Sequence, residues 1–139
     1  MKAFTKAAWP TIEPGVEYQD NWHLDAISEH LQAVVEGDIR HLIINVPPRH
    51  SKSISVAVAL PAWTWARDPS KKFLYASYAN SLSIRDGTKC RRLIDSPWYQ
   101  AHFGDKFKLT DDQNQKQRFE NDKSGYRIST SVGGALTGD

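Results

Sequence analysis

Apolar side chains recur at helical spacing through the first third of the chain. From Leu24 to Val35 they fall three or four residues apart, which places them in one stripe along a helix. Asn21 is a residue type that caps helix N-termini, and Gly37 is positioned to end the helix. The pattern then changes at Ile39–Val46 to a nearly continuous, β-branched apolar run. This run predicts a strand buried on both faces, as in a parallel sheet.

The segments on either side of this region differ in character. Residues 1–20 carry prolines and a glycine without periodicity, and they predict an extended N-terminal lead-in that packs through its aromatic residues. Residues 51–66 are compatible with a helix, although Pro61 must kink or divide it. A turn at Arg67-Asp-Pro-Ser70 follows. Residues 21–139 therefore form the structured part of the chain.

The second half predicts one more strand–helix unit and then a hairpin. Phe73–Ser77 has the composition of a strand, and a helix capped by Asn80 or Ser81 reaches about Ile94. Segments 115–121 and 126–132 flank Asp122-Lys-Ser-Gly125, which is a hairpin signal. The alternation of helices and strands predicts an α/β fold with a mostly parallel sheet flanked by helices, joined by right-handed crossovers, and a β-hairpin near the C-terminus.

Composition narrows the class of protein without naming a function. The 139 residues have the length of one domain, and 40% hydrophobic and 24% charged residues are typical of a globular chain. A net charge of +2 does not by itself indicate nucleic acid. The single cysteine, Cys90, rules out an internal disulfide and fits the reducing cytoplasm. Spanning a bilayer needs roughly 20 apolar residues. The chain has no run approaching that length.

The segment Pro47–Ser53 carries the candidate chemistry. It follows the apolar run and ends in Lys-Ser at the start of the next helix, which is the arrangement of a phosphate-binding loop. In this interpretation Lys52 reaches the β- and γ-phosphates of a nucleotide, Ser53 binds Mg²⁺, and backbone N–H groups surround the phosphates. Arg49 lies near enough to stabilise charge on the transferred phosphate.

The same loop departs from the usual Gly-x-x-x-x-Gly-Lys-Ser pattern. Val46 and Ser51 stand where that pattern has its glycines. The alternative interpretation is a solvated strand-to-helix turn that contains Lys-Ser by chance. The strand before the loop, its prolines Pro47 and Pro48, the helix after it and the second strand favour the phosphate-binding interpretation. His50 is expected to be an exposed loop residue, since no acid or nucleophile pairs with it in sequence.

Around this loop the chain resembles the large terminase subunit of tailed bacteriophages and prophages. The family's loop often reads Pro-Pro-Arg-His-Gly-Lys-Ser, and Pro47–Ser53 departs from it only at Ser51. Other similar segments follow in the family's order along nearly the whole chain: Trp22-His-Leu24, Leu60-Pro-Ala-Trp63, Tyr75-Ala-Ser-Tyr78, Arg92-Leu-Ile-Asp-Ser-Pro97, and Gly133-Gly134 with Thr137-Gly138.

The resemblance implies the N-terminal part of a P-loop NTPase of the ASCE, RecA-like type. It implies an ATPase that uses ATP and Mg²⁺ to drive double-stranded viral DNA into a procapsid. The implied partners are the portal protein, the small terminase subunit and further copies of the chain in a ring. By position, Lys52 and Ser53 become the nucleotide and Mg²⁺ residues, and Arg49 an arginine finger in cis. Trp22 and His23 become adenine-side contacts, with the alternative that Trp22 docks the first helix on the sheet.

One part of a hydrolytic site has no counterpart in the sequence. ATP hydrolysis needs an acidic residue at the end of another strand, and no apolar run here ends in Asp-Asp or Asp-Glu. The fold is therefore expected to be an incomplete P-loop ATPase domain without the nuclease domain, able to bind nucleotide but not to turn it over efficiently. An incomplete parallel sheet should also leave an open apolar edge. The alternatives are a helicase-like P-loop ATPase acting on nucleic acid, and a non-catalytic remnant or interaction module.

Overall fold

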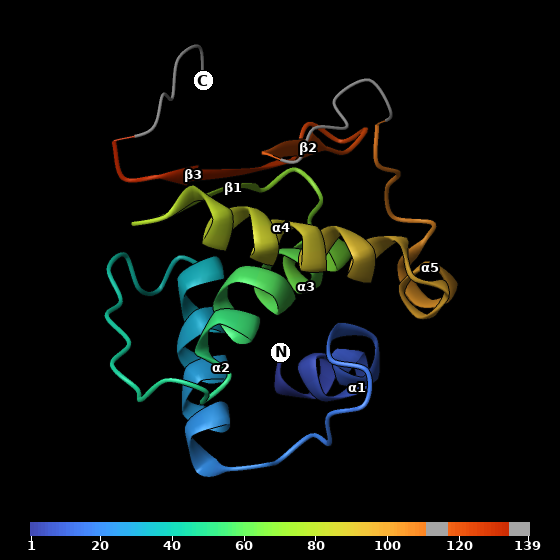
Figure 1. Cartoon of the computed structure of the whole chain (residues 1–139). Helices are drawn as coiled ribbons and strands as arrows, with labels where there is room; N and C mark the ends of the chain where they lie inside the picture. Colours follow the sequence, from blue (N-terminus) through green and yellow to red (C-terminus); the bar gives the residue numbers. More distant parts are fainter. Residues whose placement is uncertain (111–116, 134–139) are drawn as a thin grey trace.

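A computed structural model of the chain describes residues 1–110 and 117–133. Helices make up most of this part, and the strands come late in the chain (Figure 1). The elements are α1 (Lys2–Ile12), α2 (Trp22–Val35), η1 (Ile54–Ala59), α3 (Leu60–Arg67), β1 (Lys72–Ser77), α4 (Asn80–Asp95), α5 (Pro97–Phe103), β2 (Arg118–Glu120) and β3 (Tyr126–Ser131).

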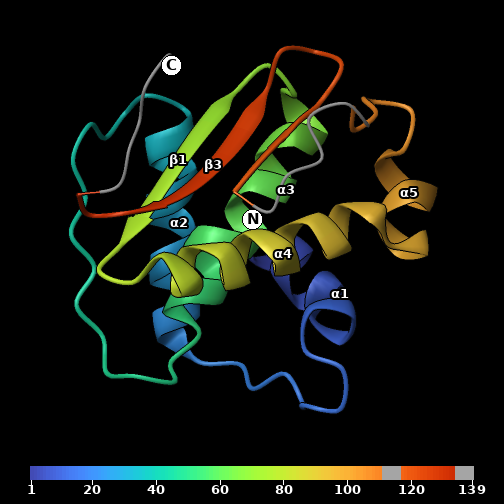
Figure 2. The same ribbon diagram turned by 45° about the horizontal axis from the view of Figure 1, so that its top comes forward.

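The sheet of the described residues is small and mixed. Its strand order is β1-β3-β2, with β1 parallel to β3 and β2 antiparallel to β3. In Figure 1 the helices lie on one side of this sheet, with α4 directly beneath it, and Figure 2 shows β1 and β3 side by side across α4. The α/β class and the hairpin of residues 118–131 are confirmed. The parallel pairing is limited to β1 and β3.

The main core lies between α4, α3 and the sheet. Trp65 is fully buried, and its ring meets the rings of Phe107 and Phe119 edge-on. Tyr99 is also fully buried, and its hydroxyl donates a hydrogen bond of 2.7 Å to the carbonyl of Ala62. The ring N–H of Trp65 donates a hydrogen bond of 2.8 Å to the carbonyl of Lys71, so these two aromatic residues fill the core without an unpaired donor.

Helix α2 forms where the apolar stripe predicted it. The side chain of Asn21 accepts a hydrogen bond from the backbone N–H of Trp22, and Leu24, Ile27 and Leu31 are buried. Gly37 has a φ of +88° after the helix end, a conformation that glycine adopts without steric cost. Both ends of this helix were therefore encoded locally.

The prediction of an extended lead-in over residues 1–20 is wrong for its first part, because Lys2–Ile12 is helix α1. The helix buries Ala8, Trp9 and Ile12 against the core, a spacing that matches one helical face. Pro10 lies inside this helix but is exposed, so its ring points away from the packed side. Tertiary contact on the apolar face outweighs the proline's cost.

The strand predicted at Ile39–Val46 does not form. The segment is extended but pairs with no strand of the described chain, and its burial alternates. Leu42, Ile44 and Val46 pack against the smaller core beside α2 and α3, whereas Ile43 is 84% exposed. A strand buried on both faces needs neighbours on both edges. The described residues place none there.

The helix expected over residues 51–66 is confirmed with an irregularity at the position of the proline. Helical structure begins at Lys52, passes through the π-helical segment η1, and continues as α3, in which Pro61 lies in the first turn. The expected cap of α4 differs, since Ala79 occupies the cap position without a side-chain hydrogen bond. The predicted residues 115–116, Gly134, Thr137 and Gly138 lie outside the described residues.

Candidate functional site

The loop Pro47–Ser53 connects the extended segment to the helix, and its backbone has an unusual conformation. Pro47, Pro48, Arg49 and His50 are exposed. Arg49 and Ser51 have φ angles of +66° and +62°, in the left-handed region that non-glycine residues rarely adopt. Such alternation of left-handed residues with ordinary ones is how consecutive backbone N–H groups come to point into one concavity that binds anions.

The helix after the loop adds to this concavity. Helical structure begins at Lys52, and the first turn is closed by a hydrogen bond of 3.0 Å from the N–H of Ser55 to the carbonyl of Ser51. The N–H groups of the preceding residues have no helical partner, and a helix N-terminus favours negative charge. This backbone geometry is of the kind that suits an anion such as a phosphate group.

Lys52 and Ser53 are both exposed at this helix start. Within residues 1–110 and 117–133, no carboxylate forms an ion pair with Lys52 or with Arg49. The positive charges at the loop are thus available to a ligand. Lys52 and Ser53 also line a hollow of about 320 Å³ together with Leu42, Ile44, Val56 and Ala57.

Arg49 and Ser51 line a second hollow, of about 580 Å³, between the loop and the linker after α1. Tyr18 and Trp9 contribute aromatic rings whose centroids lie 5.5 Å apart. Glu17 and Gln19 contribute acceptor groups at the rim. Aromatic faces with acceptors beside a phosphate-binding loop suit the base and ribose of a nucleotide.

The sequence interpretation missed the contribution of this linker to the site. Trp9 is fixed because its ring N–H donates a hydrogen bond of 2.7 Å to the carbonyl of Val16. The hydroxyl of Tyr18 is buried without a hydrogen-bond partner among the described residues. Burial raises the pKa of the Tyr18 phenol, and the charge of Asp20 adds to this effect, so the hydroxyl stays protonated. The sequence did contain a sign of this contribution. Tyr18, which has an aromatic ring, and Gln19, which has a hydrogen-bond acceptor, stand side by side shortly before the helix cap at Asn21.

The structure brings His23 to the loop but leaves Trp22 apart. The ring of His23 lies 5.5 Å from the ring of His50, and its Nε2 lies 3.1 Å from the carbonyl oxygen of His50. Trp22 is 76% exposed, so it does not dock the first helix on the sheet. It lines a smaller hollow of about 260 Å³ with His23 and the extended segment 42–46.

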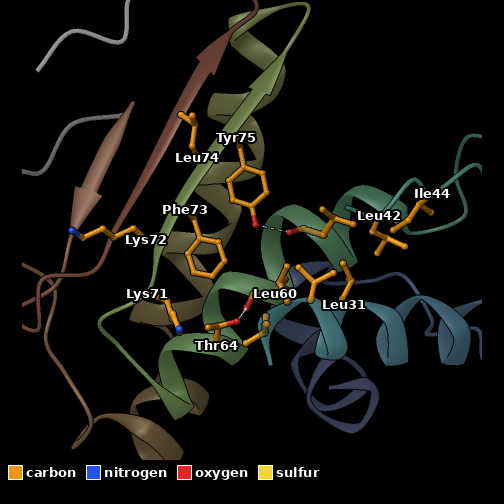
Figure 3. Close-up of a pocket in the computed structure, with 13 residues that line it drawn as sticks. Leu31, Leu42, Ile44, Leu60, Thr64, Lys71, Lys72, Phe73, Leu74 and Tyr75 are labelled. Atoms are coloured by element: carbon orange, nitrogen blue, oxygen red, sulfur yellow. Dashed lines mark hydrogen bonds between the residues drawn. The ribbon is translucent and has the colours of Figure 1, made fainter. Parts of the chain in front are cut away.

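A groove separates the extended segment from the free edge of β1. Figure 3 shows Phe73 and Tyr75 of β1 on one side, with Leu42 and Ile44 opposite and Leu31 and Leu60 at its base. Its volume is about 470 Å³ and its lining is mostly apolar. Among residues 1–110 and 117–133, β1 pairs with β3 alone, and Leu74 is 55% exposed. The predicted open, apolar sheet edge is therefore present at β1.

The described residues supply only part of what hydrolysis requires. The parallel strands β1 and β3 end at Ser77 and Ser131 rather than at an acidic residue. No group of three or more His, Cys, Asp or Glu side chains within residues 1–110 and 117–133 is arranged to hold a metal ion. A Mg²⁺ ion bound through nucleotide phosphates needs fewer protein ligands, and the predicted one, Ser53, is exposed at the start of the helix.

Comparisons with models of known protein families, with curated proteins and with solved structures found no match. None of the helices in the described part of the chain combines the length and the apolar composition that a membrane crossing requires.

Proposed function

We propose that this chain is the nucleotide-binding part of an ATP-driven DNA-packaging motor, the large terminase subunit. The observation that carries the proposal is the backbone of the loop. Arg49 and Ser51 adopt left-handed conformations directly before a helix that begins at Lys52. This backbone supports a P-loop NTPase interpretation, and the ordered resemblance along the chain supports the terminase family among the P-loop proteins.

Each residue of the site has a role in this proposal. The N–H groups of the loop and Lys52 hold the phosphates, and Ser53 binds the Mg²⁺ that accompanies ATP. Arg49 lies at the boundary between the loop and the larger hollow, where it can reach the terminal phosphate. Tyr18 and Gln19 face the base and ribose, with His23 supporting the loop through His50.

The proposed partners follow from the packaging reaction. The substrate is double-stranded viral DNA, and the motor works with the portal protein of the procapsid and with the small terminase subunit in a homo-oligomeric ring. Because β1 and β3 end in serines, the described residues lack the acidic group that would activate water. We therefore expect nucleotide binding with little or no turnover by residues 1–139.

Titration with a fluorescent ATP analogue in the presence of Mg²⁺ tests the proposal. Lys52→Ala should weaken binding about tenfold or more, because a hydrogen bond to a charged group contributes about 1.5–3 kcal/mol. Lys106→Ala is the matched control, since Lys106 is exposed away from the loop and loses the same charge. If wild-type protein does not bind the analogue, or if both variants bind equally to wild type, the proposal is wrong.

A further inference from the structure

The helix that follows the phosphate loop contains a change of register. Over η1 the hydrogen bonds widen to the π pattern, in which the N–H of Leu60 bonds to the carbonyl of Ser55. Pro61 follows immediately and has no N–H. It therefore cannot donate to the carbonyl of Ala57, its partner in an α-helix, nor to that of Val56, its partner in a π-helix.

Two side chains of the sheet supply the missing donors. The hydroxyl of Tyr75 on β1 donates a hydrogen bond of 2.7 Å to the carbonyl of Val56, as Figure 3 shows. The guanidinium of Arg127 on β3 donates one of 2.9 Å to the carbonyl of Ala57. Val56 and Ala57 carry the carbonyls to which a residue at position 61 would donate in the π and α registers respectively, and each is bonded by a side chain of a neighbouring strand.

Arg127 is placed there at a considerable cost. It is fully buried, it has no ion pair within the described residues, and its Nε has no hydrogen-bond partner among them. Burial raises the pKa of the neighbouring Cys90 thiol to about 11, so that thiol is not an anion at neutral pH. Burying an arginine without a counter-ion carries a desolvation cost, which here is offset by the hydrogen bonds of the guanidinium and by its contact with the Tyr75 ring.

The surroundings of Arg127 are shaped to the guanidinium. Its carbon lies 4.2 Å from the centroid of the Tyr75 ring, and its Nη1 donates a hydrogen bond of 2.6 Å to Ser129. On α4, a Cβ added to Gly87 would lie 2.7 Å from the same Nη1. The guanidinium is therefore enclosed by Tyr75, Ser129 and Gly87, and its Nη2 reaches the helix after the loop through the hydrogen bond to Ala57.

We infer that Tyr75 and Arg127 are positioning residues that hold this helix in its π register and so aim Lys52 and Ser53 at the phosphates. This inference rests on the proposed nucleotide-binding function. When the hydrogen bonds of a helix shift by one residue, the residues before the shift rotate by about 100° about the helix axis and move by about 1.5 Å along it. Lys52 and Ser53 precede η1 directly, so a return to the α register would turn both side chains away from the loop concavity.

Pro61→Ala provides the most discriminating variant. It restores an N–H donor for the carbonyl of Ala57, so the α register no longer lacks a partner. If Tyr75 and Arg127 have this positioning role, Pro61→Ala should weaken binding of the fluorescent ATP analogue with Mg²⁺ about tenfold. The midpoint of its unfolding in urea should stay close to that of wild type. Pro97→Ala, at the first turn of α5, is the matched control and should change neither.

The sheet variants complete the experiment. Tyr75→Phe removes only the hydroxyl and should weaken analogue binding about threefold or more in protein that remains folded. Arg127→Met should lower the urea midpoint, and this loss should be at least halved in the Pro61→Ala background, because the carbonyl of Ala57 then has its own donor. Tyr75→Phe remains informative if Arg127→Met does not fold.

The outcomes separate the two claims. Wild-type protein that fails to bind the analogue overturns the proposed function and the positioning role together, while the urea midpoints still decide the register claim. If wild-type protein binds the analogue and both Pro61→Ala and Tyr75→Phe bind it with the same affinity, only the positioning role is overturned. Equal midpoint losses from Arg127→Met in both backgrounds overturn the claim that Arg127 substitutes for the donor that Pro61 lacks.

Discussion

Replacing Ser51 with glycine tests the loop at its most unusual backbone position. Ser51 has a φ of +62°, and it stands where phosphate-binding loops usually have glycine. Glycine has no Cβ, so it adopts this conformation without a steric penalty. Ser124, in the turn between β2 and β3, has a similar φ of +71° and provides a matched control far from the loop in sequence.

The expected magnitude follows from the conformational terms. An L-residue in the left-handed region costs about 1–2 kcal/mol. The greater freedom of glycine in the unfolded chain removes about 0.5–1 kcal/mol of that gain. Ser51→Gly and Ser124→Gly should therefore each raise the free energy of unfolding by about 0.5–1 kcal/mol. For a domain of this size, that gain corresponds to a rise in Tm of about 2–4 °C.

Thermal unfolding and nucleotide titration separate the two positions. Both glycine variants should gain stability, but only Ser51→Gly should tighten binding of the fluorescent ATP analogue, by about threefold. The reason is that the missing side chain lets the phosphate approach the backbone N–H groups more closely. Ser51→Ala keeps the Cβ, so it should reproduce neither gain.

Two results would refute this reasoning. A loss of stability in Ser51→Gly would mean that the serine side chain contributes more than its backbone strain costs. Gains in stability with an unchanged analogue affinity would mean that the phosphates do not contact the backbone at Ser51.

Three further predictions concern other parts of the chain. Tyr18→Ala should weaken analogue binding more than Trp22→Ala, because Tyr18 lines the hollow beside Arg49; equal effects would contradict that placement. Burial raises the pKa of the Cys90 thiol to about 11, so stability should fall as the pH rises from about 9 to 11, and Cys90→Ala should reduce this slope measured by urea unfolding. If stability depends on pH equally in Cys90→Ala and in wild type, the raised pKa of the Cys90 thiol is contradicted. Leu74→Lys on the open edge of β1 should reduce self-association in sedimentation velocity, and wild-type protein that is already monomeric at high concentration would contradict the expectation.

Local sequence was sufficient for several elements. Helix α2 has its apolar stripe, its cap at Asn21 and its end at Gly37 all within the segment itself. Strand β1 and the hairpin turn before β3 were likewise predictable, because composition and turn residues act over a few positions. The turn at Pro47–Ser53 and the helix start at Lys52 were predictable for the same reason, whereas their role in phosphate binding stays a prediction.

Other features depended on partners distant in sequence. The segment Ile39–Val46 has a strand's composition, but a strand exists only where another backbone pairs with it, and the described residues supply none. Helix α1 was missed because Pro10 inside it and Pro14 and Gly15 after it suggest a loop, whereas burial of Ala8 and Trp9 stabilises the helix.

The sequence by itself determined the turn at Pro47–Ser53, the Lys-Ser at its end, and a proline twelve residues beyond Arg49 that had to interrupt the following helix. Only the tertiary structure decided how that interruption is accommodated. Any proline inside a helix lacks a backbone N–H and so leaves a carbonyl of the preceding turn without its hydrogen-bond donor. That Tyr75 and Arg127 replace those donors depends on two strands lying beside the helix, and strand placement is set by packing across the whole chain. The same packing brings Tyr18 and its hollow to the loop from a linker that the sequence showed only as irregular.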